Sequence, residues 1–155
     1  MNADDEIRSR TLEIASEYQM HLSKGNWDDW GRLWADDAVL EFPFAPPGRP
    51  SSYHGRSQIV SYMRAAAAAF DESTVTRRRI HVSMDPRVII AELSISASLV
   101  GAISAYDQRY VVFIETGGGL IRHYREYWNP LVAVSAYGSM DAWLSRYPVL
   151  DAIDG

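Results

Sequence analysis

Ionisable side chains crowd the segment IRHYREYWNP, residues 121–130, whose aromatic content favours a β-strand. Because side chains alternate along a strand, one face would carry Arg122, Tyr124, Glu126 and Trp128. A glutamate held between aromatic residues in a dry cavity has its pKa raised by desolvation. Such a carboxyl group suits a general acid or base that works near neutral pH. Glu126 is therefore the first candidate catalytic residue, and an ion pair with an arginine on a neighbouring strand is the alternative.

A histidine, His54, ends a proline-rich loop, residues 45–54. Imidazole titrates near physiological pH and can accept or donate a proton, so His54 is the second candidate catalytic residue. The alternative is an ordinary surface histidine of a loop. If His54 belongs to the site, this loop forms part of its mouth, and substrate selectivity depends on Pro46, Pro47 and Tyr53.

Asp107 and Arg109 lie two residues apart, on one face of the strand expected to precede that of Glu126. A carboxylate–arginine–carboxylate set of this kind can activate water for the opening of an epoxide. A cross-strand salt bridge is the alternative, which we favour because such pairs are common on sheets. Tyr106 and Tyr110 would occupy the opposite face of the same strand.

The sequence contains no pattern for a metal or a phosphate-bearing cofactor. The four histidines do not have metal-ligand spacing, and cysteine is absent. The triple glycine 117–119 joins two expected strands, whereas a phosphate-binding loop joins a strand to a helix. The arginines 77–79 alternate between faces and predict a solvated strand edge. We therefore expect neither a metal nor a cofactor.

The composition is that of an ordinary globular protein of one domain, residues 1–155. The formal net charge of −5 disfavours nucleic acid and anionic membranes as partners. The acidic N-terminus does not resemble a signal peptide, and no apolar run reaches the roughly 18 residues of a membrane span. These features, with the absence of cysteine, lead us to expect a cytoplasmic protein.

The hydrophobic pattern predicts helices first and strands later. An amphipathic stripe over residues 6–24 ends at Gly25, and a short helix follows Asn26. After a short strand at 38–44, a helix over 58–70 would turn Val60, Met63, Ala67 and Phe70 inward. Four period-two strands then follow at 75–84, 87–100, 103–115 and 121–129, with a last short helix at 139–147.

This order predicts an α+β fold in which a strongly curved antiparallel sheet packs against three N-terminal helices. Helices on one face of such a sheet enclose a cone-shaped space, lined by alternate residues of each strand. The chain has five tryptophans and nine tyrosines, which suit a lined cavity. The aromatic residues that we expect to bind a substrate are Tyr18, Trp30, Trp34, Phe42, Tyr106, Tyr124 and Trp128.

Three stretches carry a family resemblance: NWDDWGRLWADDAVLEFPFAPPG, YHGRSQIVSYM and DQRYVVFIETGGGLIRHYREYWNPLVA. They resemble the SnoaL-like branch of the nuclear-transport-factor-2 and ketosteroid-isomerase superfamily, and the last resembles phenazine biosynthesis proteins A and B. The resemblance implies a cone-shaped, cystatin-like α+β barrel, a homodimer formed through the sheet, and acid–base chemistry without a cofactor. It also implies an acid–base role for Glu126, assisted by His54.

The sequence departs from two relatives at informative positions. Where ketosteroid isomerases carry an aspartate base, Phe42 stands here, and Glu41 is one residue earlier on the opposite face. Classical steroid isomerisation is therefore not expected. Limonene-epoxide hydrolases order their strand pair as Arg-X-Asp, whereas this chain has Asp107 before Arg109.

The leading hypothesis is an acid–base isomerase, cyclase, dehydratase or condensing enzyme that acts on a small cyclic or polyketide-like metabolite. An epoxide hydrolase and a non-catalytic small-molecule-binding module are the alternatives. His123, Arg125 and Tyr127 face away from the expected pocket, and we place them in a sheet-to-sheet homodimer interface.

Overall fold

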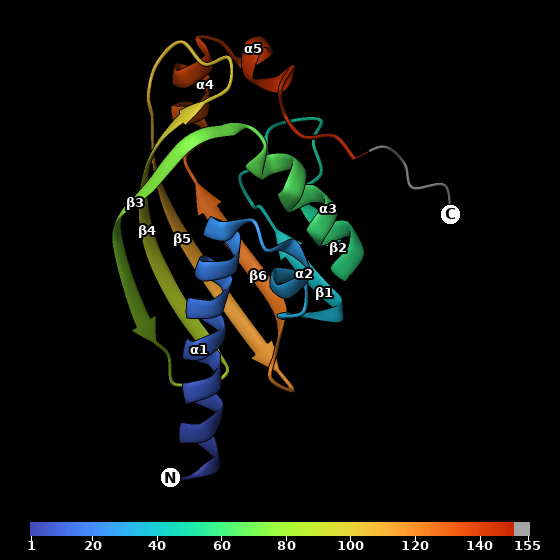
Figure 1. Ribbon diagram of the computed structural model, residues 1–155, viewed down its shortest axis with the longest axis vertical. Coiled ribbons are helices and arrows are strands. Elements are labelled where there is room, and N and C mark those ends of the chain that lie inside the picture. Colours follow the sequence, from blue (N-terminus) through green and yellow to red (C-terminus); the bar gives the residue numbers. More distant parts are fainter. Residues whose placement is uncertain (151–155) are drawn as a thin grey trace.

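A curved six-stranded sheet with helices on its concave side organises this computed structural model, which describes residues 1–150 (Figure 1). The helices are α1 (Ala3–Lys24), α2 (Trp27–Gly31), α3 (Arg56–Ala67), α4 (Pro130–Tyr137) and α5 (Met140–Leu144). The strands are β1 (Trp34–Glu41), β2 (Ser52–His54), β3 (Phe70–Val82), β4 (Val88–Leu99), β5 (Tyr106–Gly117) and β6 (Leu120–Trp128). The predicted α+β class, with three N-terminal helices over a curved sheet, is confirmed.

The strands are ordered β2-β1-β6-β5-β4-β3. Strands β3 to β6 form the antiparallel meander that the period-two pattern predicts. Strand β1 lies beside β6 in the one parallel pairing of this sheet, with Leu40 opposite Tyr124. Strand β2, which falls in the segment expected to be a loop, adds to the other edge of β1. As a result β6, the strand that carries Glu126, lies in the interior of the sheet.

Helix α1 is fixed by its caps and by one buried contact. Asn2 accepts a hydrogen bond from the backbone N–H of Asp5 at 2.9 Å, so the helix starts three residues before the predicted stripe. Gly25 ends it in the left-handed conformation, with φ of 66°, as the sequence predicts. The hydroxyls of Thr11 and Thr116 lie 2.9 Å apart and join α1 to β5.

Helix α3 turns a different face inward from the one predicted. Ile59 and Tyr62 are its buried residues, whereas Val60 and Met63 are half-buried. Both stripes are apolar and they differ by one residue, or about 100° around the helix. The sequence therefore does not decide between them, and packing against β1 does.

Helix α4 was not predicted, because Asn129-Pro130 looks like the end of a strand. In the structure Asn129 is the N-cap of a helix and accepts a hydrogen bond from the N–H of Leu131 at 3.0 Å. Pro130 then occupies the first turn, where its missing N–H costs nothing. The same two residues thus end β6 and start α4.

Trp30 and Trp34 are completely buried and tie α2 and β1 to the rest of the core. Their rings lie 5.2 Å apart, and the ring of Trp30 lies 5.3 Å from that of Tyr18 on α1. Tyr18 in turn stacks on Tyr124 of β6 at 4.8 Å. This aromatic cluster fixes the position of α1 against the strand that carries Glu126.

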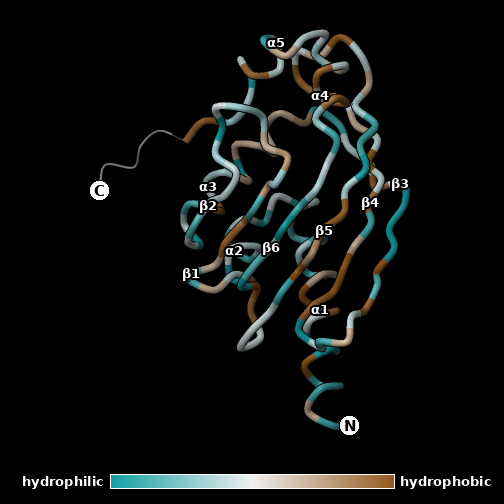
Figure 2. Tube along the Cα trace, turned by 180° about the vertical axis from the view of Figure 1, so that it is seen from behind, coloured by the Kyte–Doolittle hydropathy of each residue, from teal (hydrophilic) through white to brown (hydrophobic). Residues whose placement is uncertain are grey.

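Strand β3, at one edge of the sheet, is largely hydrophilic along its length (Figure 2). Arg77, Arg78 and Arg79 are exposed on this edge strand, in agreement with the solvated edge that the sequence predicts. Among residues 1–150 no helix is long and apolar enough to cross a membrane.

Replacing Trp30 by Ala should lower the free energy of unfolding by about 3–5 kcal/mol, because a completely buried ring leaves a cavity. Its neighbour Trp27 is half-buried, and Trp27→Ala should cost about 1 kcal/mol. Urea denaturation of the two variants measures this difference. Equal losses in the two variants would contradict the assignment of Trp30 to the core.

Candidate active site

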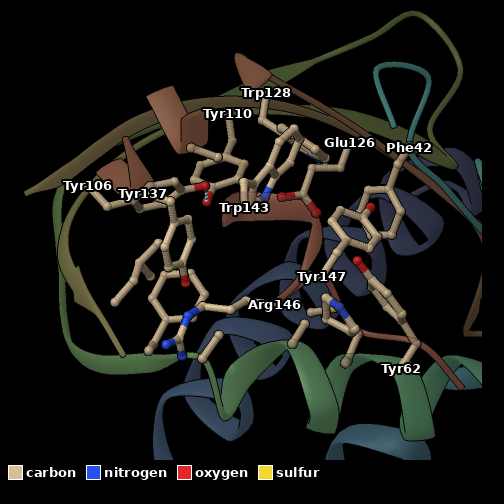
Figure 3. Close-up of a pocket in the computed structure, with 17 residues that line it drawn as sticks. Phe42, Tyr62, Tyr106, Tyr110, Glu126, Trp128, Tyr137, Trp143, Arg146 and Tyr147 are labelled. Carbon is tan, nitrogen blue, oxygen red and sulfur yellow. Dashed lines mark hydrogen bonds between the residues drawn. The ribbon is translucent and has the colours of Figure 1, made fainter. Parts of the chain in front are cut away.

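Glu126 points into the space between the sheet and the helices, where it lines two pockets (Figure 3). Within the described part of the chain its carboxyl group has no hydrogen bond and no ion pair to another side chain. Burial raises the pKa of Glu126 to about 8. The ion pair that we considered as an alternative is therefore not formed by residues 1–150, and the carboxyl group is largely protonated at neutral pH.

A β-bulge decides which residues of β6 face the pockets. Glu115 pairs with His123 and the next residue of β5, Thr116, pairs with Ile121, so Arg122 is an extra residue in β6. The bulge turns Ile121 inward, where it is completely buried. The predicted inward face of β6 is therefore wrong at Arg122, its first residue.

Arg122 is instead exposed, and its guanidinium group bonds to the carboxylate of Asp37 at 3.0 Å. Beyond the bulge the predicted alternation holds. Tyr124, Glu126 and Trp128 face inward, while His123 faces outward and bonds to Glu41 at 2.8 Å. Glu41 thus lies on the face opposite the pocket, as its place in the sequence predicts.

The first cavity, which we call the cap pocket, lies under α4, α5 and the residues that follow α5 (Figure 3). Its volume is about 150 Å³. The hydroxyls of Tyr106 and Tyr110 lie 2.9 Å apart on its β5 side. Most of its lining is apolar or aromatic, and the aromatic residues besides these two are Phe42, Tyr62, Phe70, Trp128, Tyr137, Trp143 and Tyr147.

The second cavity, the helix pocket, lies between α1, the end of α3, β3 and β4, and has a volume of about 760 Å³. Tyr18, Trp27 and Tyr124 contribute aromatic surface to it, and Lys24 and Arg64 also line it. Glu126, Tyr110 and Phe70 line both pockets. One molecule that occupies both pockets would therefore pass the carboxyl group.

Five of the seven aromatic residues expected to bind a substrate line a pocket. Tyr18 and Tyr124 line the helix pocket, and Phe42, Tyr106 and Trp128 line the cap pocket. Trp30 and Trp34 line neither, which corrects the prediction for these two. The cause is that Trp34 starts β1 rather than extending α2, so both indoles pack in the core.

The sequence prediction omitted several residues that line the cap pocket. Tyr110 shares a strand face with Tyr106, so strand alternation gave a signal for it. Tyr62 was missed because the sequence analysis predicted a different inward face for α3. Trp143 and Tyr147 are four residues apart at the end of the chain, and their spacing gave no indication that they return to the pocket.

His54 does not lie in the site, contrary to the prediction. Its ring is exposed, bonds to the hydroxyl of Ser52 at 3.0 Å, and lines neither pocket that contains Glu126. The reason is strand alternation in β2. Tyr53 pairs with Leu40 and is buried, so the next side chain points outward.

Pro46, Pro47 and Tyr53 likewise line neither pocket. Tyr53 is instead buried against Tyr62, with the two rings stacked at 4.0 Å. Loop 45–54 therefore does not form the pocket surface that the sequence predicts.

Asp107 and Arg109 also point away from Glu126. Both are exposed on the other face of β5, and Asp107 accepts a hydrogen bond from Ser96 at 2.7 Å. Between them Gln108 is buried and donates to the carbonyl of Asn129 at 2.8 Å. The set proposed for epoxide opening is therefore not assembled.

The tyrosines around Glu126 act as hydrogen-bond donors rather than bases. Burial raises the pKa of Tyr18, Tyr110 and Tyr124 above the usual value, so these hydroxyls keep their protons at neutral pH. No group of three or more histidine, aspartate or glutamate side chains suited to a metal occurs in residues 1–150. The cap pocket thus offers one carboxyl group, that of Glu126, beside neutral tyrosine hydroxyls and aromatic walls.

Comparison with known proteins connects this site to a family. The SnoaL-like domain family matches residues 15–124. YesE of Bacillus subtilis strain 168, an uncharacterized protein, is 32% identical over 129 residues, which are 83% of this chain and 88% of YesE. An uncharacterized PhzA/B-like protein of Pseudomonas aeruginosa, PA3332, is 32% identical over 124 residues, 78% of this chain and 85% of its own.

Among solved structures, a provisionally named isomerase from Bacillus subtilis matches with a TM-score of 0.78 and 32% sequence identity. The match covers 89% of this chain and 96% of the isomerase chain. The predicted resemblance is confirmed by these matches. The family match ends two residues before Glu126. Residues 139–148, which contribute part of the cap-pocket lining, therefore also lie beyond it.

The raised pKa of Glu126 predicts a stability that depends on pH. The folded state keeps the proton to about pH 8, whereas the unfolded chain loses it near pH 4.5. Between these values unfolding releases a proton, so the stability of the wild type relative to Glu126→Gln should fall by about 1.4 kcal/mol per pH unit. Below pH 4 the difference should be constant.

Denaturation of both proteins in urea from pH 4 to pH 9 measures this slope. Carbon-13 NMR of the carboxyl group gives the pKa directly. A midpoint near the ordinary value of about 4.3 would show that the pocket is wet and the prediction wrong.

Proposed function

Since the chain belongs to the SnoaL-like domain family, we propose that it is an acid–base enzyme that isomerises, cyclises or condenses a small cyclic or polyketide-like metabolite. Glu126 moves the proton in this proposal. The observation that carries it is an unpaired carboxyl group in an aromatic pocket, with a pKa of about 8. A group of this kind exchanges protons readily near neutral pH, which is the requirement for general acid–base catalysis.

In an isomerisation the carboxylate form of Glu126 removes a proton from the carbon beside a carbonyl group. The resulting acid returns this proton to another carbon or to oxygen, so no proton is gained or lost overall. Roughly one carboxyl group in ten is ionised at pH 7 when the pKa is about 8, so both forms are present. Hydroxyls such as those of Tyr110 and Tyr147 can donate hydrogen bonds to an enolate oxygen.

The size of the two pockets supports a substrate with one small ring or head group and a larger remainder. A cavity of about 150 Å³ holds a molecule the size of benzene, which matches the cap pocket. The helix pocket, at about 760 Å³, lies within the roughly 300–1,000 Å³ of small-molecule sites. A relative with a PhzA/B-like name and a structure with an isomerase name support acid–base chemistry on a small molecule, and we place this molecule in secondary metabolism or catabolism.

A non-catalytic binding protein is the second candidate. The observation in its favour is that His54 lies outside the site, which leaves Glu126 without the second proton-transfer group that the sequence suggested. In a binding protein the aromatic walls hold the ligand, and the carboxyl group donates or accepts one hydrogen bond. The two candidates differ in whether turnover requires the proton of Glu126.

We also propose a homodimer formed through the convex face of the sheet. On this face the guanidinium group of Arg125 lies 4.6 Å from the ring centre of Phe113 and 5.8 Å from that of Tyr127. Tyr127 also contacts Phe44, which is half-exposed. Arginine and aromatic residues are enriched in protein interfaces, and exposed rings of this kind favour a partner surface.

Glu126→Gln should lower the catalytic rate by roughly 100-fold or more, because the amide keeps the shape and cannot exchange a proton. His54→Gln is the matched control and should change the rate less than about threefold, because its side chain lies outside both pockets. Substrates can be found by screening cyclic ketones and polyketide-like compounds for thermal stabilisation, followed by turnover assays. A wild-type rate in Glu126→Gln would exclude the proton-transfer role, and ligand binding without turnover would favour the binding protein.

For the interface, sedimentation at micromolar concentration should give a dimer for the wild type and a monomer for Arg125→Glu. Asp107→Asn changes charge on the same convex face at an exposed position and should leave the dimer intact. A wild-type monomer at this concentration would contradict the proposal.

A further inference from the structure

Residues 139–148, the cap segment, lie at one end of the sheet (Figure 1), and their side chains form part of the wall of the cap pocket. They comprise the five-residue helix α5 and the irregular chain after it, and they lie beyond the match to the SnoaL-like family. Their contribution to the pocket lining is Trp143, Arg146, Tyr147 and Pro148. Part of the wall around Glu126 therefore comes from a segment with little regular structure of its own.

The cap segment is attached to the body of the protein by Arg49. The guanidinium group of Arg49 donates to the carbonyl of Leu144 at 3.0 Å and lies 5.9 Å from the ring centre of Tyr147. Arg49 has no ion pair with a carboxylate among the residues that the structure describes. Its charge is thus directed at a carbonyl group and an aromatic ring of the cap segment.

A continuous set of contacts leads from Arg49 to the neighbourhood of Glu126. The rings of Tyr147 and Trp143 lie 5.7 Å apart, and those of Trp143 and Trp128 lie 5.9 Å apart. Trp128 is two residues from Glu126 on the same face of β6. Tyr147 and Trp143 are both buried and stand between this part of the pocket and solvent.

A second contact holds the cap segment on the other side. The guanidinium group of Arg146 packs against Gly101 so closely that a Cβ atom there would lie 2.2 Å from it. Arg146 is exposed, whereas Arg49 is half-buried and reaches the segment from a loop that is distant in sequence. Arg49 is therefore the stronger candidate for the contact that sets the position of the segment.

We propose that Arg49 is a positioning residue that holds the cap segment over the cap pocket, so that Trp143 and Tyr147 select the group bound beside Glu126 and exclude water from its carboxyl group. This inference deepens the proposed function, on which its meaning for a substrate rests. It also assigns a role to loop 45–54, which acts on the site through Arg49 rather than by lining the pocket.

The titration of Glu126 can report on the cap segment, because the tyrosine hydroxyls around it stay neutral. Burial raises the pKa of the tyrosines that approach it from α1, α3, β5, β6 and the cap segment: Tyr18, Tyr62, Tyr106, Tyr110, Tyr124 and Tyr147. The cations that line the pockets are Lys24, Arg64 and Arg146, and the one other acid is Asp71. None of these changes in an Arg49 variant, so a change in the titration of Glu126 reports the entry of water.

Arg49→Met is the main test, since methionine keeps much of the length and removes the charge and the donors. We expect the pKa of Glu126, measured by carbon-13 NMR, to fall by at least one unit toward its ordinary value. Backbone amides of residues 143–148 should exchange with deuterium at least tenfold faster. Arg87→Met is the matched control, because Arg87 is exposed at the β3–β4 turn and pairs with Asp85, and it should change neither measurement.

If Arg49→Met does not fold, Arg49→Lys tests the same contact, because lysine keeps the charge and loses the planar guanidinium group. Both measurements should then shift in the same direction by a smaller amount. An unchanged pKa and unchanged exchange in the folded variant would overturn the proposal. Neither measurement needs a substrate, so this outcome is distinct from a failure of the catalytic role of Glu126.

Selection by the cap segment is tested with Tyr147→Ala. Removing this ring enlarges the cap pocket, so bulkier members of a compound series should raise the melting temperature of the variant and not that of the wild type. Phe44→Ala, at an exposed ring that lines neither pocket, is the control and should leave the order of the ligands unchanged. The same order in Tyr147→Ala and the wild type would refute the selective role.

Discussion

One constraint governs the site: the carboxyl group of Glu126 lies in an aromatic pocket without a counter-charge. Ionising it there costs free energy. Water would stabilise the charged form of Glu126, and so would an arginine, but no side chain of residues 1–150 pairs with it. The protein holds the group largely in its neutral form, with a pKa of about 8. Glu126 is half-buried and also borders the larger helix pocket, so each wall that limits the access of water to its carboxyl group contributes to this pKa.

The walls of the pocket differ in how they are built. On one side the buried indoles of Trp30 and Trp34 pack under Tyr18 and Tyr124, which fixes α1 against β6. Close packing of large rings resists displacement, because any movement opens a cavity. On the other side the cap segment has little regular structure, and its buried residues Trp143 and Tyr147 pack in a smaller apolar cluster with Ala133, Ala136 and Tyr137. The core of the domain thus positions the carboxyl group, while the cap segment shapes the pocket beside it.

Family membership sets the frame of the site and leaves its specificity open. The matched residues 15–124 contain α2, α3, the second half of α1 and most of the sheet. Glu126 and the cap segment follow them in sequence. Phe42, which by the family resemblance stands where ketosteroid isomerases carry an aspartate base, contributes apolar surface to the cap pocket. In the proposed function the chemistry rests on Glu126, a carboxyl group at a different position.

Local pattern determined much of this protein. The end of α1 at Gly25, the meander and the inward alternation of Tyr124, Glu126 and Trp128 follow from nearest-neighbour geometry, which a sequence displays directly. Alternation also separates Asp107 and Arg109 from Tyr106, as predicted.

Tertiary structure decided the rest, because it depends on contacts between residues far apart in the chain. Pairing of β2 with β1 turned His54 outward, and a bulge removed Arg122 from the pocket face. The end of the chain returned to bring Trp143 and Tyr147 beside Glu126. Such contacts carry no periodic signal, since they arise only when loops close and distant surfaces pack together.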